Sequence, residues 1–180
     1  MRSAVFLDRD GVINRATILD GKSYPPQSFD EFEFLPGVED AIRELSVSGL
    51  LVVVVTNQPD VATGKQLQGV VEEMHSFIKQ HLPIDDIQVC YHSSDMGCNC
   101  RKPNAGMLKN AAKSLNIDLA KSYMVGDRWR DVEAGNNAGC RKCYFIDYGY
   151  AEQKPVPPFE TVRDLADAAA RILSSHVDLS

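Results

Sequence analysis

Two aspartates separated by a single residue, Asp8 and Asp10, are the side chains of this chain best suited to catalysis. They follow the apolar run at residues 4–7, which predicts a buried strand, and Gly11 comes directly after them. Side chains alternate along an extended segment, so the two carboxylates share a face while Arg9 points elsewhere. Two like charges this close raise each other's pKa unless a cation compensates them. A divalent cation would do so and leave one carboxylate as a nucleophile, although an acidic pair taken alone is more often part of a turn or a helix cap.

A second polar cluster, Thr56-Asn57-Gln58, ends the apolar run at residues 50–55. Hydroxyl and amide groups at this point suit phosphate oxygens, because ligands of open α/β sheets bind outside the carboxyl ends of the strands. A polar turn explains the three residues equally well when they are taken alone.

A basic pair, Arg101 and Lys102, stands just before Pro103 and a predicted helix. Two adjacent cations can clamp a phosphate, with lysine as a point charge and arginine as a bidentate fork. Basic pairs are more often solvated surface, so this pair depends on what else lies near it.

The fourth cluster begins with Asp127 at the end of a short apolar run and reaches Asp131 one helical turn later. It again puts an acid at the carboxyl end of a strand, where the acid can complete a metal site. Capping of the following helix by Asp127 is the alternative interpretation.

The elements that must position these clusters are strands and helices in alternation. Apolar residues at i, i+3, i+4 and i+7 predict helices, and short apolar or β-branched runs predict strands. The predicted strands are residues 4–7, 50–55, 87–90, 123–125 and 144–146, and the predicted helices are residues 38–45, 67–78, 105–115, 130–138 and 161–174. We predict an irregular segment at residues 14–34 and a surface connection at residues 152–158. The alternation predicts an α/β fold, a doubly wound, mainly parallel sheet with helices on both faces.

The composition indicates a single domain, residues 1–180, that is large enough to bury its own core. Hydrophobic residues make up 44% of the chain, and no apolar run approaches the roughly 18 residues of a membrane span. The N-terminus has no signal-peptide pattern, so we expect a cytoplasmic monomer without a membrane partner. The net charge of −6 argues against nucleic-acid binding, which requires a basic surface.

In chain order the four clusters read D-x-D-G, T-N, K-P and G-D-x-x-x-D, and three of them directly end an apolar strand. This order and placement resemble the haloacid dehalogenase (HAD) superfamily of phosphatases, and the resemblance covers nearly the whole chain. It implies a Rossmann-like fold and a two-step phosphoryl transfer through an aspartyl-phosphate. Such a transfer needs positioning and charge neutralisation more than covalent chemistry from the protein.

The resemblance assigns roles to the acidic residues. Asp8 would attack phosphorus, and Asp10 would protonate the leaving alcohol and then activate water. Catalytic Mg²⁺ would be held by the Asp8 side chain, the Asp10 backbone carbonyl and Asp127, with Asp131 in support.

The other polar residues would hold the substrate. By the same resemblance, Thr56 and Lys102 would bind the oxygens of the transferred phosphoryl group. The residues expected to bind the rest of the substrate are Asn57, Gln58, Lys65, Arg101 and Arg128.

Three cysteines and a histidine lie close together in the sequence, at Cys90, His92, Cys98 and Cys100. Three soft sulfurs and one imidazole nitrogen are the ligand set of a closed, four-coordinate zinc site. Scattered or buried thiols are the alternative, which the local density disfavours. We therefore predict structural Zn²⁺ that shapes the loop leading into the basic pair.

A zinc loop that runs directly into the basic pair resembles HAD subfamily IIIA, the subgroup of D-glycero-D-manno-heptose 1,7-bisphosphate 7-phosphatases and histidinol-phosphatases. Members of this subgroup lack a separate cap domain and select substrates with loops. Here these loops would be residues 14–34, residues 58–65 and the zinc loop. One position departs from the heptose enzymes, because Thr63 stands where they carry an arginine; Lys65 is the cation that could replace it.

The resemblance implies that the substrate is a small phosphorylated sugar, and a heptose bisphosphate is the preferred candidate. The enzyme would remove its 7-phosphate in nucleotide-heptose and surface-glycan biosynthesis. Histidinol phosphate or another small phosphomonoester is the alternative substrate.

Two non-enzymatic classes remain as alternatives. A phospho-accepting signalling domain is usually shorter and needs neither Asp10 nor a zinc loop, and a zinc-bearing interaction domain leaves the strand-end acids unused.

Overall fold

The centre of the protein is a six-stranded sheet in the order β5-β4-β1-β6-β7-β8, in which every neighbouring pair is parallel. The computed structural model describes residues 1–177. The strands are β1 (Ala4–Leu7), β4 (Leu51–Asn57), β5 (Asp86–Cys90), β6 (Tyr123–Gly126), β7 (Lys142–Ile146) and β8 (Glu160–Val162). The predicted doubly wound α/β fold is confirmed.

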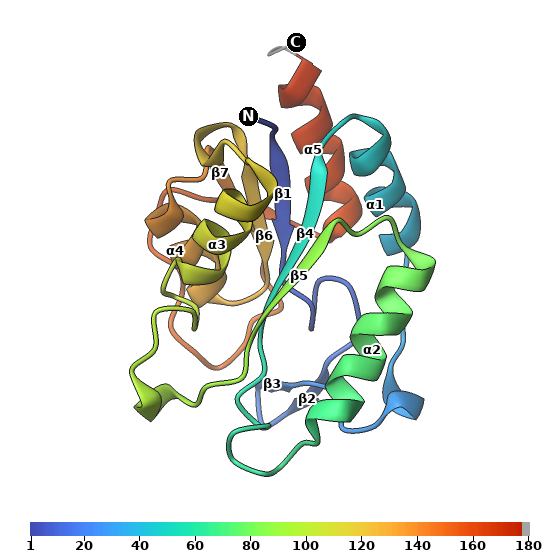
Figure 1. Ribbon diagram of the computed structural model, residues 1–180, viewed down its shortest axis with the longest axis vertical. Helices are drawn as coiled ribbons and strands as arrows, with labels where there is room; N and C mark the ends of the chain where they lie inside the picture. Colours follow the sequence, from blue (N-terminus) through green and yellow to red (C-terminus); the bar gives the residue numbers. More distant parts are fainter. Residues whose placement is uncertain (178–180) are drawn as a thin grey trace.

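Helices cover both faces of this sheet (Figure 1). On one face α1 and α5 pack together, and α2 adds Ile78 to the same core; α3 and α4 pack on the other face. The α-helices are α1 (Val38–Val47), α2 (Gln68–His81), α3 (Gly106–Leu115), α4 (Trp129–Ala138) and α5 (Leu165–Val177), and the short 3₁₀ helices are η1 (Phe29–Glu31), η2 (Ser94–Met96) and η3 (Leu119–Lys121). No helix among residues 1–177 is long and apolar enough to cross a membrane.

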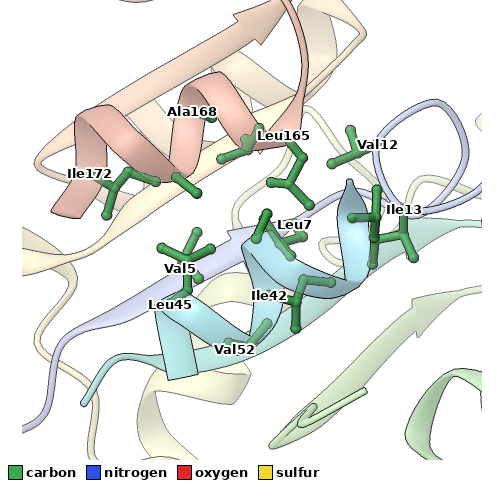
Figure 2. Close-up of a cluster of buried hydrophobic side chains, with 14 of the residues drawn as sticks. Val5, Leu7, Val12, Ile13, Ile42, Leu45, Val52, Leu165, Ala168 and Ile172 are labelled. Carbon is green, nitrogen blue, oxygen red and sulfur yellow. The ribbon is translucent and has the colours of Figure 1, made fainter. Parts of the chain in front are cut away.

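Alternation along the strands divides the core into two layers. In β1, Val5 and Leu7 belong to the layer under α1 and α5, whereas Ala4 and Phe6 belong to the layer under α3 and α4. All four are fully buried, which is why the strand is a continuous apolar run, as expected for a parallel strand covered on both sides. Figure 2 shows the first layer, with side chains from β1 and β4 facing those from α1 and α5.

The order of the strands creates a crevice at one edge of the sheet. The chain runs outward from β1 through β4 to β5 and then returns to β6 on the other side of β1. Ligands of open α/β sheets bind at such a switch point, outside the carboxyl ends of the strands. The residues that follow β1, β4 and β6 are therefore brought together there.

A hairpin lies beyond this edge, inside the segment that we predicted to be irregular. It is formed by β2 (Thr17–Leu19) and β3 (Lys22–Tyr24) (Figure 1). The turn residues Asp20 and Gly21 both have positive φ, 50° and 71°, the conformation that Asp-Gly favours in two-residue hairpins. The strands were missed because they are too short and too exposed to show an alternating pattern.

Aromatic rings fasten the rest of this segment to α2. The ring of Phe77 contacts the rings of Phe29, Phe32 and Phe34 at centroid distances of 5.3, 5.9 and 5.6 Å. Such contacts stabilise beyond the apolar area that they bury. Residues 29–34 are thereby fixed against α2.

The prediction of a helix starting at residue 161 was wrong. Residues Glu160–Val162 form the edge strand β8, and α5 begins only at Leu165. The side chain of Asp164 accepts a hydrogen bond from Asp167 N at 2.8 Å, so Asp164 caps the helix. The connection at residues 152–158 therefore leads into a strand.

Candidate functional site

Three aspartates meet at the switch point of the sheet. Asp8 follows β1, Asp127 follows β6 and Asp131 lies in the first turn of α4. A carboxylate oxygen from each lies within 4.8 Å of the others, and all three residues are buried. Three carboxylates this close need a cation between them.

Lys102 supplies one positive charge to this acidic cluster. Its Nζ lies 2.8 Å from Asp8 Oδ1 and 2.7 Å from Asp131 Oδ1, and it donates a hydrogen bond to the Val55 carbonyl at 2.8 Å. Burial alone would lower the pKa of Lys102, but Asp131 and Asp8 raise it above its usual value. The side chain therefore remains a cation at neutral pH.

One lysine does not neutralise the cluster. Burial, followed by the charge of Asp131, raises the pKa of Asp8 to about 7 despite the opposing effect of Lys102. Burial and the charges of Asp8 and Asp131 raise the pKa of Asp127 well above its usual value. The site therefore favours additional positive charge.

Glycines give the carboxylates room to approach each other. A Cβ on Gly11, whose φ is +86°, would lie 2.0 Å from Asp127 Oδ2, and one on Gly126 would lie 2.1 Å from Asp131 Cβ. Both distances are impossible for real atoms, so any side chain at these positions would displace the acids. We conclude that the backbone of the D-x-D-G turn is fitted to Asp127.

The donor set fits a hard divalent cation. Asp127 Oδ1 is buried and, within the part of the chain that the structure describes, has no hydrogen-bond partner. An unpartnered buried carboxylate oxygen beside two further carboxylates is a ligand set for Mg²⁺, which binds oxygen. Asp8, Asp127 and Asp131 are the side chains that could hold it.

The side chain of Asp10 is directed into a separate network beside the acidic cluster. Its carboxylate accepts hydrogen bonds from Arg9 Nη2 at 2.9 and 3.0 Å, from Asn14 Nδ2 at 2.9 Å and from Gln58 Nε2 at 2.8 Å. The prediction that Arg9 points away from this region was wrong. Arg9 is fully buried and pairs with Asp10, because β1 ends at Leu7 and the chain then turns, with Ile13 N donating to Arg9 O at 2.8 Å.

The side chain of His75 in α2 contacts the guanidinium of Arg9. Its Nε2 lies 3.1 Å from Arg9 Nη1. Burial, with the Arg9 charge adding to it, lowers the pKa of His75 to about 3, so its imidazole is neutral and can accept this hydrogen bond. No pattern in the sequence links residues 9 and 75.

The polar residues at the carboxyl end of β4 have different environments. Thr56 is buried, and its Oγ1 accepts a hydrogen bond at 3.0 Å from Gln58, which also donates to Asp10. Asn57 pairs with the backbone of Lys102 through two hydrogen bonds of 3.1 Å. Gln58, predicted to bind substrate, is 2% exposed and directed at Thr56 and Asp10.

A cavity of about 570 Å³ opens from the acidic cluster. Asp8, Asp10 and Lys102 lie on its wall, and the hairpin β2–β3 contributes Leu19 and Tyr24. Besides Lys102, its basic side chains are Lys65, Arg101, Arg128 and Arg130, and its other acidic side chains are Glu31, Asp60 and Asp131. A cavity of this size suits a small molecule, and its basic side chains could bind an anionic group of that molecule.

Two residues of this region, Glu152 and Arg130, were missed by the sequence analysis. Glu152 binds Arg128 through two oxygens and lies 4.0 Å from Arg130 Nη2. Glu152 comes from the loop after β7, which we had interpreted as a surface connection. Arg130 stands in the sequence only two residues after Arg128, and the run of two arginines around Trp129 was an available signal.

The cysteine-histidine cluster has the dimensions of a metal site. The three Sγ atoms of Cys90, Cys98 and Cys100 lie 3.2–3.7 Å apart. His92 Nδ1 lies 3.6 Å from Cys90 Sγ and 3.1 Å from Cys100 Sγ. Zn–S bonds of about 2.3 Å in a tetrahedron separate the sulfurs by about 3.8 Å, so the four ligand atoms fit one zinc ion.

Comparison with protein families and with curated proteins places the chain among phosphatases. The model of the HAD-hydrolase-like family matches residues 99–168. The D-glycero-beta-D-manno-heptose-1,7-bisphosphate 7-phosphatase of Escherichia coli K12 is 38% identical, over 98% of this chain and 91% of its own length. The enzyme of the same name from Haemophilus influenzae is 42% identical, over 87% and 85%.

Solved structures agree with this comparison. The D,D-heptose 1,7-bisphosphate phosphatase from B. bronchiseptica, complexed with magnesium and phosphate, superposes with a TM-score of 0.79 at 31% identity, over 96% of this chain and 99% of that one. A HAD-like protein from Mesorhizobium loti gives a TM-score of 0.80 at 30% identity, over 99% of this chain and 88% of that one.

Proposed function

Because this chain belongs to the HAD-like family of heptose-1,7-bisphosphate 7-phosphatases, we propose that it removes the 7-phosphate of D-glycero-β-D-manno-heptose 1,7-bisphosphate. The protein is a phosphatase, and the structure of the relative from B. bronchiseptica holds magnesium and phosphate. The observation that carries the substrate proposal is the cavity, in which a buried acidic cluster with its lysine opens toward several basic side chains. Such a substrate presents one phosphate to the acids and another to the bases, in a step of nucleotide-heptose and surface-glycan synthesis.

The proposed reaction has two steps. In the first, a carboxylate oxygen of Asp8 attacks phosphorus, the bond to the sugar oxygen breaks, and Asp10 gives its proton to that oxygen. In the second, Asp10 takes a proton from water, the water attacks the aspartyl-phosphate, and phosphate leaves Asp8. The network of Arg9, Asn14 and Gln58 supports this role by fixing the Asp10 carboxylate.

Asp8, Asp127 and the Asp10 backbone carbonyl are the proposed Mg²⁺ ligands, with Asp131 in support. When bound, Mg²⁺ supplies positive charge that offsets the acids and the phosphoryl oxygens. The ammonium group of Lys102, 2.8 Å from Asp8 Oδ1, neutralises part of the charge that develops during transfer. The buried hydroxyl of Thr56 is the second proposed contact of the phosphoryl group.

The basic side of the cavity is the proposed site for the remainder of the substrate. Arg101 and Lys65 line it, which supports Lys65 as a replacement for the family arginine at Thr63. Thr63 itself is exposed, and its hydroxyl donates to the Asp60 carbonyl at 3.2 Å. Asn57 contributes by holding the backbone of Lys102, and Arg128, which also lines the cavity, is a further proposed substrate contact.

A substrate panel tests this proposal. Phosphate release with Mg²⁺ is measured for α- and β-heptose 1,7-bisphosphate, histidinol phosphate and fructose 1,6-bisphosphate. We expect the highest kcat/KM for the β-heptose, about tenfold or more above each other compound, because the relatives of this chain are named for that anomer; tenfold is about 1.4 kcal/mol. A preference for histidinol phosphate, or release of the 1-phosphate first, would overturn the substrate proposal.

We also propose that the cysteine-histidine cluster holds one structural Zn²⁺ per chain. Zinc measured on the purified protein should equal the protein on a molar basis. Cys100→Ser should lose the metal and lower the melting temperature, because a closed zinc site contributes directly to folding. Cys140→Ser, which changes a cysteine outside the cluster, is the matched control and should keep the zinc. Full zinc content in Cys100→Ser would contradict the site.

One sheet carries both core layers and the site, which supports our proposal that residues 1–180 act as one catalytic domain. We propose further that it works as a cytoplasmic monomer on a small molecule, with no nucleic-acid or membrane partner.

A further inference from the structure

A tyrosine from outside the four sequence clusters contacts the acidic cluster directly. Tyr150 lies in the loop between β7 and β8, and its hydroxyl donates a hydrogen bond to Asp127 Oδ2 at 2.7 Å. Tyr150 is 8% exposed and Asp127 is 1% exposed, so water does not compete for this bond.

This hydrogen bond distinguishes the two oxygens of Asp127. Oδ2 is bound by Tyr150, whereas Oδ1 is buried and has no hydrogen-bond partner among residues 1–177. A carboxylate fixed at one oxygen cannot rotate without breaking that bond. The bond therefore determines which oxygen is left for a cation.

The turn after β1 is shaped around the same pair. A Cβ on Gly11 would lie 2.0 Å from Asp127 Oδ2 and 3.3 Å from the Tyr150 hydroxyl. Gly11 thus leaves the space in which the hydrogen bond forms.

The loop that carries Tyr150 is fixed at several other points. Tyr148 donates its hydroxyl to the Gly11 carbonyl at 3.0 Å, and Ala151 N donates to the Gly21 carbonyl of the hairpin turn at 2.8 Å. The Arg128 guanidinium lies 5.6 Å from the centre of the Tyr150 ring. The hydroxyl of Tyr150 is therefore held in place by contacts that do not involve Asp127.

We propose that Tyr150 is a positioning residue for the metal site, which turns the Asp127 carboxylate so that Oδ1 is presented to Mg²⁺. Groups that hydrogen-bond a metal ligand orient it, and their loss typically weakens metal binding 10–100-fold. The inference rests on the proposed role of Asp127 as a Mg²⁺ ligand. The alternative is that Tyr150 merely satisfies its own buried hydroxyl and anchors the loop.

The test is metal binding by three variants. Mn²⁺ binding to the zinc-loaded protein is followed by the electron paramagnetic resonance of the free ion, and Mg²⁺ affinity is obtained by competition. We expect Tyr150→Phe to bind Mg²⁺ about 10-fold more weakly or worse. In assays, the Mg²⁺ concentration for half-maximal rate should rise by the same factor, while kcat at saturating Mg²⁺ stays within a few-fold of wild type.

Tyr148→Phe is the matched control, because it removes a hydroxyl that anchors the same loop without contacting a carboxylate, and it should keep wild-type Mg²⁺ affinity. Wild-type affinity in Tyr150→Phe, or an equal loss in Tyr148→Phe, would overturn the inference. Asp127→Asn separates this result from a failure of the site itself. If Asp127→Asn binds Mg²⁺ normally, the ligand assignment is wrong; if it loses binding and Tyr150→Phe does not, only the role of Tyr150 is wrong.

Discussion

Asp8→Asn is expected to reduce phosphate release to background while the chain remains folded and retains its zinc. An amide is a poor nucleophile and cannot form the aspartyl-phosphate, and loss of a covalent nucleophile can cost a factor of about 10⁶ in kcat. Phosphate release is measured at saturating substrate and Mg²⁺, with folding checked by circular dichroism. Wild-type turnover in the variant would show that Asp8 is not the nucleophile.

The same substitution should change how the stability of the Mg²⁺-free protein depends on pH. Burial, followed by the Asp131 charge, raises the pKa of Asp8 from 3.8 to about 7 in the folded protein. A carboxyl whose folded pKa is raised destabilises the folded state as pH increases from about 4 through 7, because ionisation is easier in the unfolded chain. Asparagine does not ionise, so in Mg²⁺-free buffer, with the zinc retained, the melting temperature of Asp8→Asn relative to wild type should rise from pH 5 to pH 8.

Glu73→Gln is the matched control for this second result. It makes the same change from carboxylate to amide on an exposed position of α2. Its melting temperature should differ from wild type by a nearly constant amount over this pH range. A constant difference for Asp8→Asn as well would show that burial does not disfavour the Asp8 charge.

The central residues of the site were predictable because they directly end apolar strands. The continuous apolar runs of β1, β4 and β6 identify buried parallel strands, and parallel strands present their carboxyl ends at one edge. The proximity of Asp8 and Asp127 could therefore be predicted from the sequence alone, and the structure places both in the acidic cluster. The cysteine-histidine cluster was recognisable because its residues lie close together in the sequence, between the end of β5 and the loop that follows it.

The supporting residues could not be predicted in this way. Tyr150 and Glu152 come from a loop whose return to the crevice depends on its contacts with the hairpin and with Gly11. His75 meets Arg9 across 66 positions of the chain. These contacts are set by the packing of surface segments, for which neither periodicity nor a local motif provides a signal.

The wrong prediction for the direction of the Arg9 side chain shows the limit of the rule that side chains alternate along a strand. Side chains alternate only while the backbone is extended, and β1 ends at Leu7, one residue before the acidic pair. The turn that follows, with Gly11 at a φ of +86°, brings Arg9 and Asp10 together. Gly11 itself was visible in the sequence and indicated that the extended conformation would not continue.

Lys102→Met is expected to impair both catalysis and stability, because Lys102 is the buried counter-ion of the acidic cluster. The substitution keeps the length of the side chain but leaves Asp8 and Asp131 without the ammonium group that lies 2.8 and 2.7 Å from them. Removal of one partner from a buried ion pair costs about 3–5 kcal/mol of stability. Removal of a group that stabilises developing charge costs about 10²–10³ in kcat.

The two effects can be separated with Mg²⁺, which supplies positive charge to the same carboxylates. In Mg²⁺-free buffer the melting temperature of Lys102→Met should fall well below that of wild type. Saturating Mg²⁺ should reduce the difference, because the acids that lack their lysine in the variant bind the cation more tightly than those of wild type. The loss in kcat should persist at saturating Mg²⁺, because a cation among the aspartates does not restore the ammonium group beside the phosphoryl oxygens. Lys109→Met, on the exposed side of α3, is the matched control and should leave both quantities unchanged. Full recovery of kcat by Mg²⁺ would mean that Lys102 serves only to neutralise the acids, and that the phosphoryl group is held by other residues.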